Sequence, residues 1–359
     1  MFSTIFIAFI SLMGLVVLHE FGHFILAKKF GVKVEEFGIG YPPRIFSKKI
    51  GETIYSLNLL PFGAFVKLPG ELERIEDEQS FSKQPIGKRT LIILGGVLSF
   101  WIIAIILFSI VFVLGTQMAI GDEIDSGIIN PKVQISAVIS DSPANLAGLK
   151  PGDTILNLQS QNLNLKVEKV KEVQEFTNQN LGQEITLTIE RGKEVFDVSL
   201  VPRTSPPSGE GPMGVALVRT VVKSYPWYQA LWQAISATAN MTLAIIKGYQ
   251  QVIKNLISGL PWGIELTGPV GIFNLLSQAS QLGLNYFLQF VGIIAIYIAL
   301  FNILPIPAVD GGKLLFLGIE FIRKKPVSQK VEQNITAFFF SLLLILMVWV
   351  TIKDIKKLF

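Results

Sequence analysis

Four long apolar stretches constrain this chain more than any other feature of its sequence. They cover residues 1–18, continuing through a polar notch to residue 27, and residues 91–118, 282–307 and 335–352. Each is close to the ~20 residues that a helix needs to cross a bilayer. The first stretch lacks a basic start and a small-residue cleavage pattern, which disfavours a cleaved signal peptide. The sequence therefore predicts an α-helical integral membrane protein with four transmembrane helices.

The composition of the 359-residue chain agrees with a membrane protein, because 50% of its residues are hydrophobic and only 16% are charged. Soluble domains average about 25% charged residues. The chain has no cysteine, which excludes disulfide scaffolds, thiol nucleophiles and cysteine-ligated metal centres. Its net charge of +4 forms no basic stripe suited to nucleic acid. The expected partners are therefore the lipid bilayer and membrane proteins, with no nucleic acid.

Basic residues set the expected orientation of the spans. With four spans, three basic clusters fall on one side, which should be the cytoplasm: Lys28 and Lys29, Lys88 and Arg89, and residues 323–325. A weaker cluster in residues 353–357 falls on the opposite side. Residues 121–220 are then expected outside the cytoplasm.

Residues 225–246 carry no charge but contain regularly scattered polar side chains. This pattern is typical of an amphipathic helix that lies at the membrane interface. A fifth span is the alternative, but it would place residues 323–325 on the opposite side from Lys88 and Arg89. We expect the interfacial arrangement.

The composition becomes soluble-like between the second and third apolar stretches. Short segments rich in Val, Ile and Thr predict strands at residues 133–139, 154–158, 185–190 and 195–201, with an amphipathic helix around residues 167–176. Residues 142–155, S-P-A-N-L-A-G-L-K-P-G-D-T-I, resemble the signature of bacterial PDZ domains. We expect an inserted α+β PDZ domain at residues 121–204, which either binds an extended peptide end, as PDZ domains do, or only limits access sterically. The segment 211–215 is a weak candidate for a carboxylate-binding loop.

The sequence His19-Glu20-Phe21-Gly22-His23 lies in the first apolar stretch. Positions i and i+4 share one face of a helix, so both imidazoles can bind one zinc ion while Glu20 lies beside it as a general base. These are the only two histidines of the chain. Because two imidazoles and a carboxylate are costly near hydrocarbon unless they are partnered, the pattern predicts a metal site.

A catalytic zinc ion usually has three protein ligands, and the chain offers no third histidine and no cysteine. Asp310 is the candidate, because it lies in an apolar region directly after Pro305 and Pro307. These prolines should unwind the third span locally, and an aspartate there needs a partner. The alternative is that Asp310 only caps the next helix. Two histidines and a carboxylate suit Zn²⁺ best and Fe²⁺ second.

Taken together, these features resemble the site-2 protease family of intramembrane zinc metalloproteases, in its bacterial RseP-like branch. The segments that carry the resemblance are the H-E-x-x-H, N-I-L-P-I-P-A-V-D-G at 302–311, F-G-I-G-Y-P at 37–42, L-P-F-G-A-F-V-K at 60–67 and T-G-P-V-G at 267–271. Pro42 and Ala64 stand where the family has glycine. The chain has room for one PDZ domain, whereas the named branch has two.

The resemblance implies roles for several residues. His19, His23 and Asp310 would ligate zinc, Glu20 would activate water, and Asn302 would bind the substrate backbone or the oxyanion. Residues 53–68 would form a membrane-associated, re-entrant β-hairpin that turns near residues 61–63. An edge of this hairpin would pair with an unwound substrate, so Leu57, Leu59 and Gly63 are candidate substrate-binding residues.

The expected organisation is a membrane core formed by residues 1–120 and 282–359, the PDZ domain, and a linker with the interfacial helix at residues 205–281. The expected function is zinc endopeptidase cleavage of transmembrane segments of single-span proteins, such as anti-sigma factors or signal-peptide remnants, in the bacterial cytoplasmic (inner) membrane. A metal transporter and a PDZ-bearing adaptor without activity are the alternatives. A transporter typically shows an inverted repeat, and none is visible.

Overall fold

The computed structural model describes residues 2–71, 73, 75–124, 130–160, 163–192, 194–261 and 266–358, and the side chains of all of these except 2–5, 62 and 358. Met1 of the first predicted span, residues 125–129, 161–162 and 193 of the predicted PDZ domain, and residues 262–265 of the predicted linker lie outside the described residues. The chain separates into two compact units. We call Met1–Ser109, Leu231–Ser277 and Leu288–Phe359 the membrane unit, and Ile110–Ala230 with Gln278–Phe287 the sheet unit.

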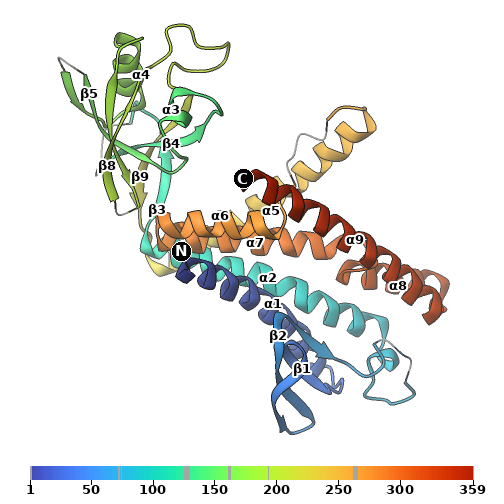
Figure 1. Cartoon of the computed structure of the whole chain (residues 1–359). Coiled ribbons are helices and arrows are strands. Elements are labelled where there is room, and N and C mark those ends of the chain that lie inside the picture. Colours follow the sequence, from blue (N-terminus) through green and yellow to red (C-terminus); the bar gives the residue numbers. More distant parts are fainter. Residues whose placement is uncertain are drawn as a thin grey trace. The chain divides into compact units, whose positions relative to one another are not determined.

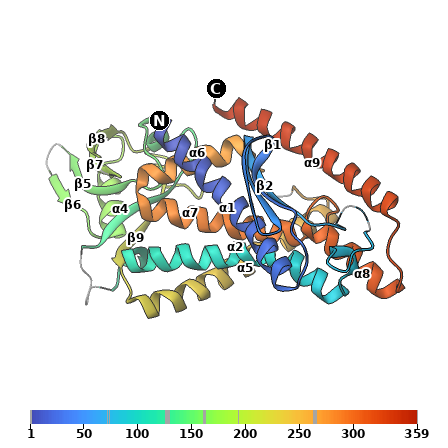
Figure 2. The ribbon, with the colours of Figure 1, turned by 90° about the horizontal axis from the view of Figure 1, so that it is seen from below.

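Within the described residues, four helices are long and apolar enough to cross a membrane. They are α1 (Phe2–Lys29), α2 (Ile86–Leu114), α7 (Leu284–Ile303) and α9 (Gln329–Leu358), shown in two views in Figures 1 and 2. The four predicted spans are thereby confirmed by length and composition. Helix α5 (Trp227–Ile257) is not among them, and its place at the membrane interface remains a prediction.

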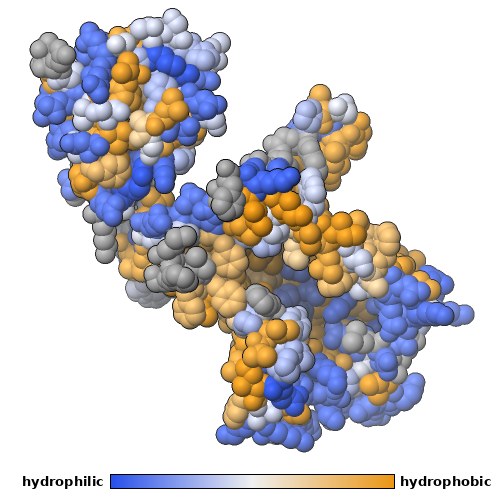
Figure 3. Space-filling view, viewed as in Figure 1, coloured by the Kyte–Doolittle hydropathy of each residue, from blue (hydrophilic) through white to orange (hydrophobic). Residues whose placement is uncertain are grey.

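Helix α9 exposes large apolar side chains, Phe338 and Ile345 among them. Figure 3 shows apolar side chains gathered along this helix. An exposed apolar surface of this kind marks a site of contact with lipid or another protein. It therefore agrees with a helix whose surroundings are lipid.

Small residues bring α1 and α2 together in the membrane unit. A Cβ atom at Gly22 would overlap the backbone of Gly95, so the two helices cross with their backbones in close contact. Further along α1, Ala27 packs with the buried side chains of Ile92 and Ile93 of α2. The crossing fixes the part of α1 that carries both histidines.

A small irregular sheet follows α1 and consists of β1 (Glu36–Ile50) and β2 (Thr53–Lys67). Ile39 pairs with both Leu57 and Ala64, so the chain reverses between these two residues, and Gly63 there has a φ of +104°. The reversal coincides with the predicted turn near residues 61–63. The sheet packs on α1, where the ring of Phe24 contacts those of Phe37 and Tyr55.

The sheet is larger than the predicted hairpin of residues 53–68, because β1 contributes further segments to it. Leu57 pairs with Phe46 as well as with Ile39, so its backbone does not lie at an edge. The expectation that Leu57 offers an edge is therefore wrong. In the described part of the chain, residues 64–67 pair only with residues 36–39 and form an edge of the sheet. Alternating side chains identify a strand but not its neighbours, which depend on tertiary packing.

The third span is interrupted as the two prolines predict. Helix α7 ends at Ile303, and α8 (Asp310–Arg323) begins after an irregular segment of six residues, 304–309. Gly311 and Gly312 allow this segment to fold back closely, because a Cβ atom at either would overlap the backbone of residues 303–307. The residue at the N-cap of α8 is Val309 rather than Asp310, so Asp310 does not serve as the helix cap.

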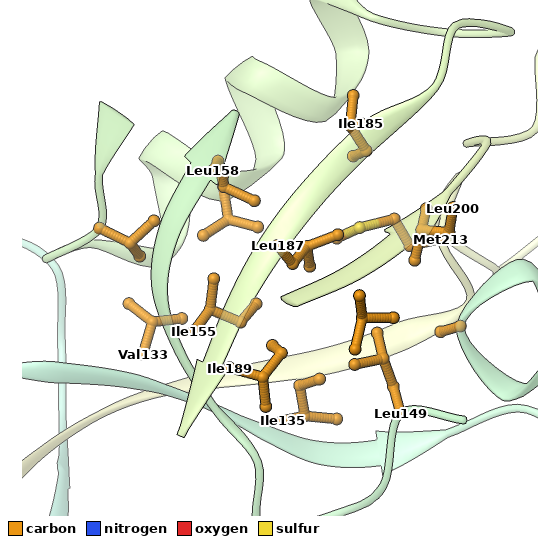
Figure 4. Close-up of a cluster of buried hydrophobic side chains, with 14 of the residues drawn as sticks. Val133, Ile135, Leu149, Ile155, Leu158, Ile185, Leu187, Ile189, Leu200 and Met213 are labelled. Atoms are coloured by element: carbon orange, nitrogen blue, oxygen red, sulfur yellow. The ribbon is translucent and has the colours of Figure 1, made fainter. Parts of the chain in front are cut away.

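The sheet unit contains one antiparallel sheet with the strand order β3 (Thr116–Ile120), β9 (Val215–Lys223), β4 (Lys132–Val138), β5 (Thr154–Ser160), β7 (Ile185–Arg191) and β8 (Glu194–Leu200), and with β6 (Leu163–Lys166) beside β5. Two helices, α3 (Pro143–Leu146) and α4 (Val170–Gln179), accompany it. The alternating side chains of β4, β5 and β7 form its core, including Val133, Ile155 and Leu187 (Figure 4). Val173 and Phe176 of α4 complete this core.

The sheet extends past residue 204, where the sequence analysis ended this domain. Strand β9 lies between β3 and β4, and the Pro- and Gly-rich run before it is a loop within the sheet unit. This loop is closed by a hydrogen bond from the Arg203 amide to the Pro212 carbonyl and by the Arg203–Glu210 ion pair. The remaining helices are η1 (Phe81–Lys83) and α6 (Pro269–Leu282).

Candidate active site

Two helices of the membrane unit bring three potential metal ligands together. His19 and His23 lie one turn apart on α1, and Asp310 is the first residue of α8. Oδ2 of Asp310 lies 3.2 Å from Nε2 of His19 and 3.3 Å from Nε2 of His23. The two Nε2 atoms are 3.2 Å apart. The structure thus assembles the three residues that the sequence pattern singles out.

The surroundings of His23 orient its ring. Its Nδ1 atom lies 2.9 Å from the carbonyl oxygen of Ile92 on α2, so Nδ1 carries a hydrogen and Nε2 faces Asp310. The absence of a side chain at Gly96 makes room for the ring, because a Cβ atom there would overlap it. His19 stacks on the ring of Phe100 at 4.7 Å between ring centroids.

The geometry fits a bound metal ion. Oδ2 of Asp310 is buried and receives no hydrogen bond from the described residues. Three ligands that bind zinc tetrahedrally at ~2.0–2.1 Å lie about 3.3 Å from one another. The separations of 3.2 to 3.3 Å between the three ligand atoms match that value. A dication would give the orphaned carboxylate oxygen the partner that it lacks.

Two of the three residues, His19 and Asp310, line a cavity of about 550 Å³ in the membrane unit. Glu20 and Asn302 line this cavity together with His19 and Asp310. Nδ2 of Asn302 donates to the carbonyl oxygen of Ile298 at 3.1 Å, which leaves one amide hydrogen for another acceptor. A carboxylate and an amide therefore share one cavity with the potential metal ligands.

The candidate substrate-binding residues of the small sheet are not among the described residues that line this cavity. Leu57 and Leu59 lie on β2 with 48% and 56% of their surface exposed. Gly63 lies at the chain reversal of the same strand, close to the ring of Tyr41. The structure therefore does not bring these three residues to the cluster.

Among the charged cavity residues that the sequence did not point to are Lys313 and Glu71. Lys313 of α8 and Glu71, which follows the small sheet, form an ion pair. Partial burial lowers the pKa of the Lys313 ammonium, but the carboxylates of Glu71 and Asp310 outweigh it and raise that pKa above its ordinary value. The position of Lys313, three residues after Asp310 on a helix, is a signal that could have identified it. No sequence signal points to Glu71.

The apolar helices, the interrupted third span and the buried cluster of two imidazoles and a carboxylate are the features expected of a membrane zinc metalloprotease of the site-2 protease type. The chain belongs to peptidase family M50, whose sequence profile it matches over residues 7–346.

Relatives of known name agree with this assignment. A protein of Clostridium perfringens with a provisional name as a zinc metalloprotease is 32% identical to this chain over 97% of each chain. The zinc metalloprotease RasP of Geobacillus kaustophilus is 27% identical over 98% of each chain. The regulator of sigma-W protease RasP of Bacillus subtilis is 27% identical over the full length of both chains.

Proposed function

We propose that His19, His23 and Asp310 hold the zinc ion and that Glu20 transfers protons during peptide hydrolysis. The observation that carries this proposal is the mutual separation of the three ligand atoms, 3.2 to 3.3 Å, beside a cavity that Glu20 lines. Zinc bound there supplies Lewis-acid chemistry, because it lowers the pKa of water and polarises a carbonyl group.

Glu20 takes the proton of the attacking water and later delivers it to the leaving amine. It follows His19 directly on α1, which places it at the wall of the same cavity. The free amide hydrogen of Asn302 is donated to the substrate carbonyl oxygen, on which negative charge develops.

We propose that the substrates are transmembrane segments of single-span proteins. An intact helix hides its peptide groups in internal hydrogen bonds, so the segment must unwind before hydrolysis. Residues 64–67 form an edge of the small sheet that an unwound segment can join as a further strand. Leu57 and Leu59, whose side chains are exposed on β2, and Gly63 at the chain reversal next to the edge are the further substrate contacts that we propose.

Regulatory membrane proteins such as anti-sigma factors are the substrate class that we favour, with signal-peptide remnants as a second class. The name of the Bacillus subtilis relative, a regulator of sigma-W protease, supports the first class.

We also propose that the sheet unit is a PDZ domain that takes an extended peptide end. Strand β9 pairs with β4 over residues 215–220, whereas β3 pairs only with residues 219–223. Among the described residues, no strand therefore pairs with residues 215–218 on the side of β9 where β3 lies. This free edge is next to the segment 211–215, which the sequence suggests as a carboxylate-binding loop. If the unit is only a steric filter, a carboxy-terminal peptide will not shift the amide resonances of residues 215–218.

The orientation that we propose places the sheet unit outside the cytoplasm of a bacterial cytoplasmic membrane. Lys28 and Lys29 after α1, Lys88 and Arg89 at the start of α2, and residues 323–325 after α8 support it, because cytoplasmic loops carry an excess of basic residues.

Cleavage of a single-span substrate by detergent-purified protein tests this function. The wild type is compared with Glu20→Gln, and zinc is measured in both. We expect the wild type to cut within the span, and Glu20→Gln to keep its zinc and lose cleavage. If both proteins bind zinc and neither cuts any of several substrates with short ectodomains, the peptidase function is rejected in favour of a transporter or an adaptor.

A further inference from the structure

The cavity beside the proposed zinc site contains an ion pair that the hydrolytic mechanism does not use. Nζ of Lys313 donates to Oε1 of Glu71, and both residues line the cavity together with His19, Glu20 and Asp310. Lys313 lies three residues after Asp310, so both side chains belong to the first turn of α8 and share one face.

Glu71 belongs to the loop that directly continues the small sheet. Strand β2 ends at Lys67, Leu68 is buried against α1, α2 and Leu317 of α8, and the Glu71 amide donates to the Leu68 carbonyl oxygen at 3.2 Å. The loop is held further by a hydrogen bond from the Phe81 amide to the Pro69 carbonyl oxygen. The position of Glu71 is therefore fixed relative to the edge at residues 64–67.

A second ion pair holds the other end of α8. Arg89 at the start of α2 donates to both carboxylate oxygens of Glu320, at 2.6 and 3.1 Å. Arg89 and Glu320 also line the cavity, but they are mostly enclosed, with exposures of 11% and 18%, whereas Lys313 is 42% exposed. Glu320 lies seven residues after Lys313. The Arg89–Glu320 pair therefore anchors the later part of α8 to α2 without fixing the first turn of α8.

The first turn of α8 follows the irregular segment 304–309, which has no helical hydrogen-bond ladder of its own. The first turn of α8 is placed by the close packing of Gly311 and Gly312 on residues 303–307 and by contacts of its own side chains. One such contact is that of Asp310 with the two imidazoles, and the ion pair to Glu71 is another.

We propose that Lys313 and Glu71 are positioning residues of the peptidase. Their ion pair fixes the first turn of α8, and with it the carboxylate of Asp310, relative to the loop that continues the substrate edge. This inference rests on the proposed zinc ligands. It assigns to the pair a role in zinc binding and turnover that the Arg89–Glu320 pair does not share.

The test compares full-length Lys313→Met, Glu71→Gln and the conservative Lys313→Arg with the matched control Arg89→Met. Zinc affinity is measured by competition with a chelator, kcat and KM with a single-span substrate, and Tm by thermal unfolding. We expect Lys313→Met and Glu71→Gln each to weaken zinc binding about 10- to 100-fold, the range for residues that orient metal ligands. They should lower kcat more than they raise KM.

Lys313→Arg should recover most of the loss, because a guanidinium can also pair with Glu71. Arg89→Met should lower Tm more than Lys313→Met does and keep zinc affinity within about twofold of wild type. The inference is overturned if Arg89→Met weakens zinc binding as much as Lys313→Met, or if Lys313→Met and Glu71→Gln bind zinc like the wild type. A wild type that binds no zinc contradicts the proposed ligands instead, so the two failures are distinguishable.

Discussion

The Nδ1 atom of His23 lies 2.9 Å from the carbonyl oxygen of Ile92, on the neighbouring helix α2. A carbonyl oxygen only accepts hydrogen bonds, so the ring hydrogen is on Nδ1 and the other ring nitrogen is free to bind a metal. Metal-binding histidines commonly have such a partner, which fixes both the tautomer and the ring orientation. The contact between α1 and α2 is therefore part of the proposed zinc site.

Removal of the carboxylate should abolish tight zinc binding. Asp310→Asn keeps the shape of the side chain but loses the negative charge. We expect zinc affinity to fall by more than the ~10- to 100-fold that is typical when a residue that only orients a metal ligand is replaced. Cleavage should be lost in parallel. Stripping zinc from the wild type with a chelator should give the same inactivity, reversed by added zinc. Retention of stoichiometric zinc by the variant during dialysis would exclude Asp310 as a ligand.

Enlarging Gly96 should damage the site without touching a ligand. A Cβ atom at this position would overlap the His23 ring, so Gly96→Ala should displace the ring. We expect zinc affinity to fall roughly 10- to 100-fold, the range for substitutions of residues that orient metal ligands. Gly87→Ala on the same helix is the control, since no atom lies within 4 Å of a Cβ atom built there. Equal zinc affinities for the two variants would contradict this packing argument.

The sheet unit should depend on one buried ion pair. Asp153 is fully buried, accepts from the Lys150 amide at 2.8 Å, and pairs with Nε and Nη2 of Arg191 at 2.6 and 2.7 Å. Removing one member of a buried pair costs about 3–5 kcal/mol. Asp153→Ala should therefore speed hydrogen exchange of the β7 amides in the full chain.

The exposed Lys166–Glu168 pair serves as the control for Asp153→Ala, because solvent-exposed pairs contribute little. Lys166→Ala should leave the exchange of the β7 amides unchanged. Similar exchange in both variants would show that the Asp153–Arg191 pair does not hold the sheet together.

The proposed orientation can be measured directly because the chain has no cysteine. Leu146→Cys places a single thiol on the sheet unit at a position that is 80% exposed. Lys325→Cys places one after α8. In spheroplasts, a membrane-impermeant maleimide should label the first thiol and not the second until the membrane is broken. The opposite labelling pattern would reverse the orientation.

Most of the membrane unit follows from local features of the sequence. The apolar lengths predict α1, α2, α7 and α9, because a bilayer requires that number of residues. The H-E-x-x-H spacing predicts that His19 and His23 share a face, and the two prolines predict the break before Asp310. Each of these features depends on neighbours within a few residues.

The features that the sequence could not predict depend on distant partners. Alternation identified β2, but the pairing of Leu57 on both sides depends on β1 folding beside it. The turn-rich run before β9 has the composition of a linker, but it connects two strands of the sheet unit, because turn residues are the same in both settings. Glu71 acquires its partner 242 residues further along the chain, and nothing in the residues around it signals that contact.

The order of the proposed ligands along the chain has a consequence for biosynthesis. His19 and His23 lie on α1, whereas Asp310 is translated only after α1, α2 and α7. A ribosome-bound or truncated polypeptide that ends before α8 has the two imidazoles and Glu20 but lacks the third proposed ligand, Asp310. If these three residues are the zinc ligands, we expect hydrolytic activity only after α8 has been synthesised, so an incomplete chain in the membrane should be inactive.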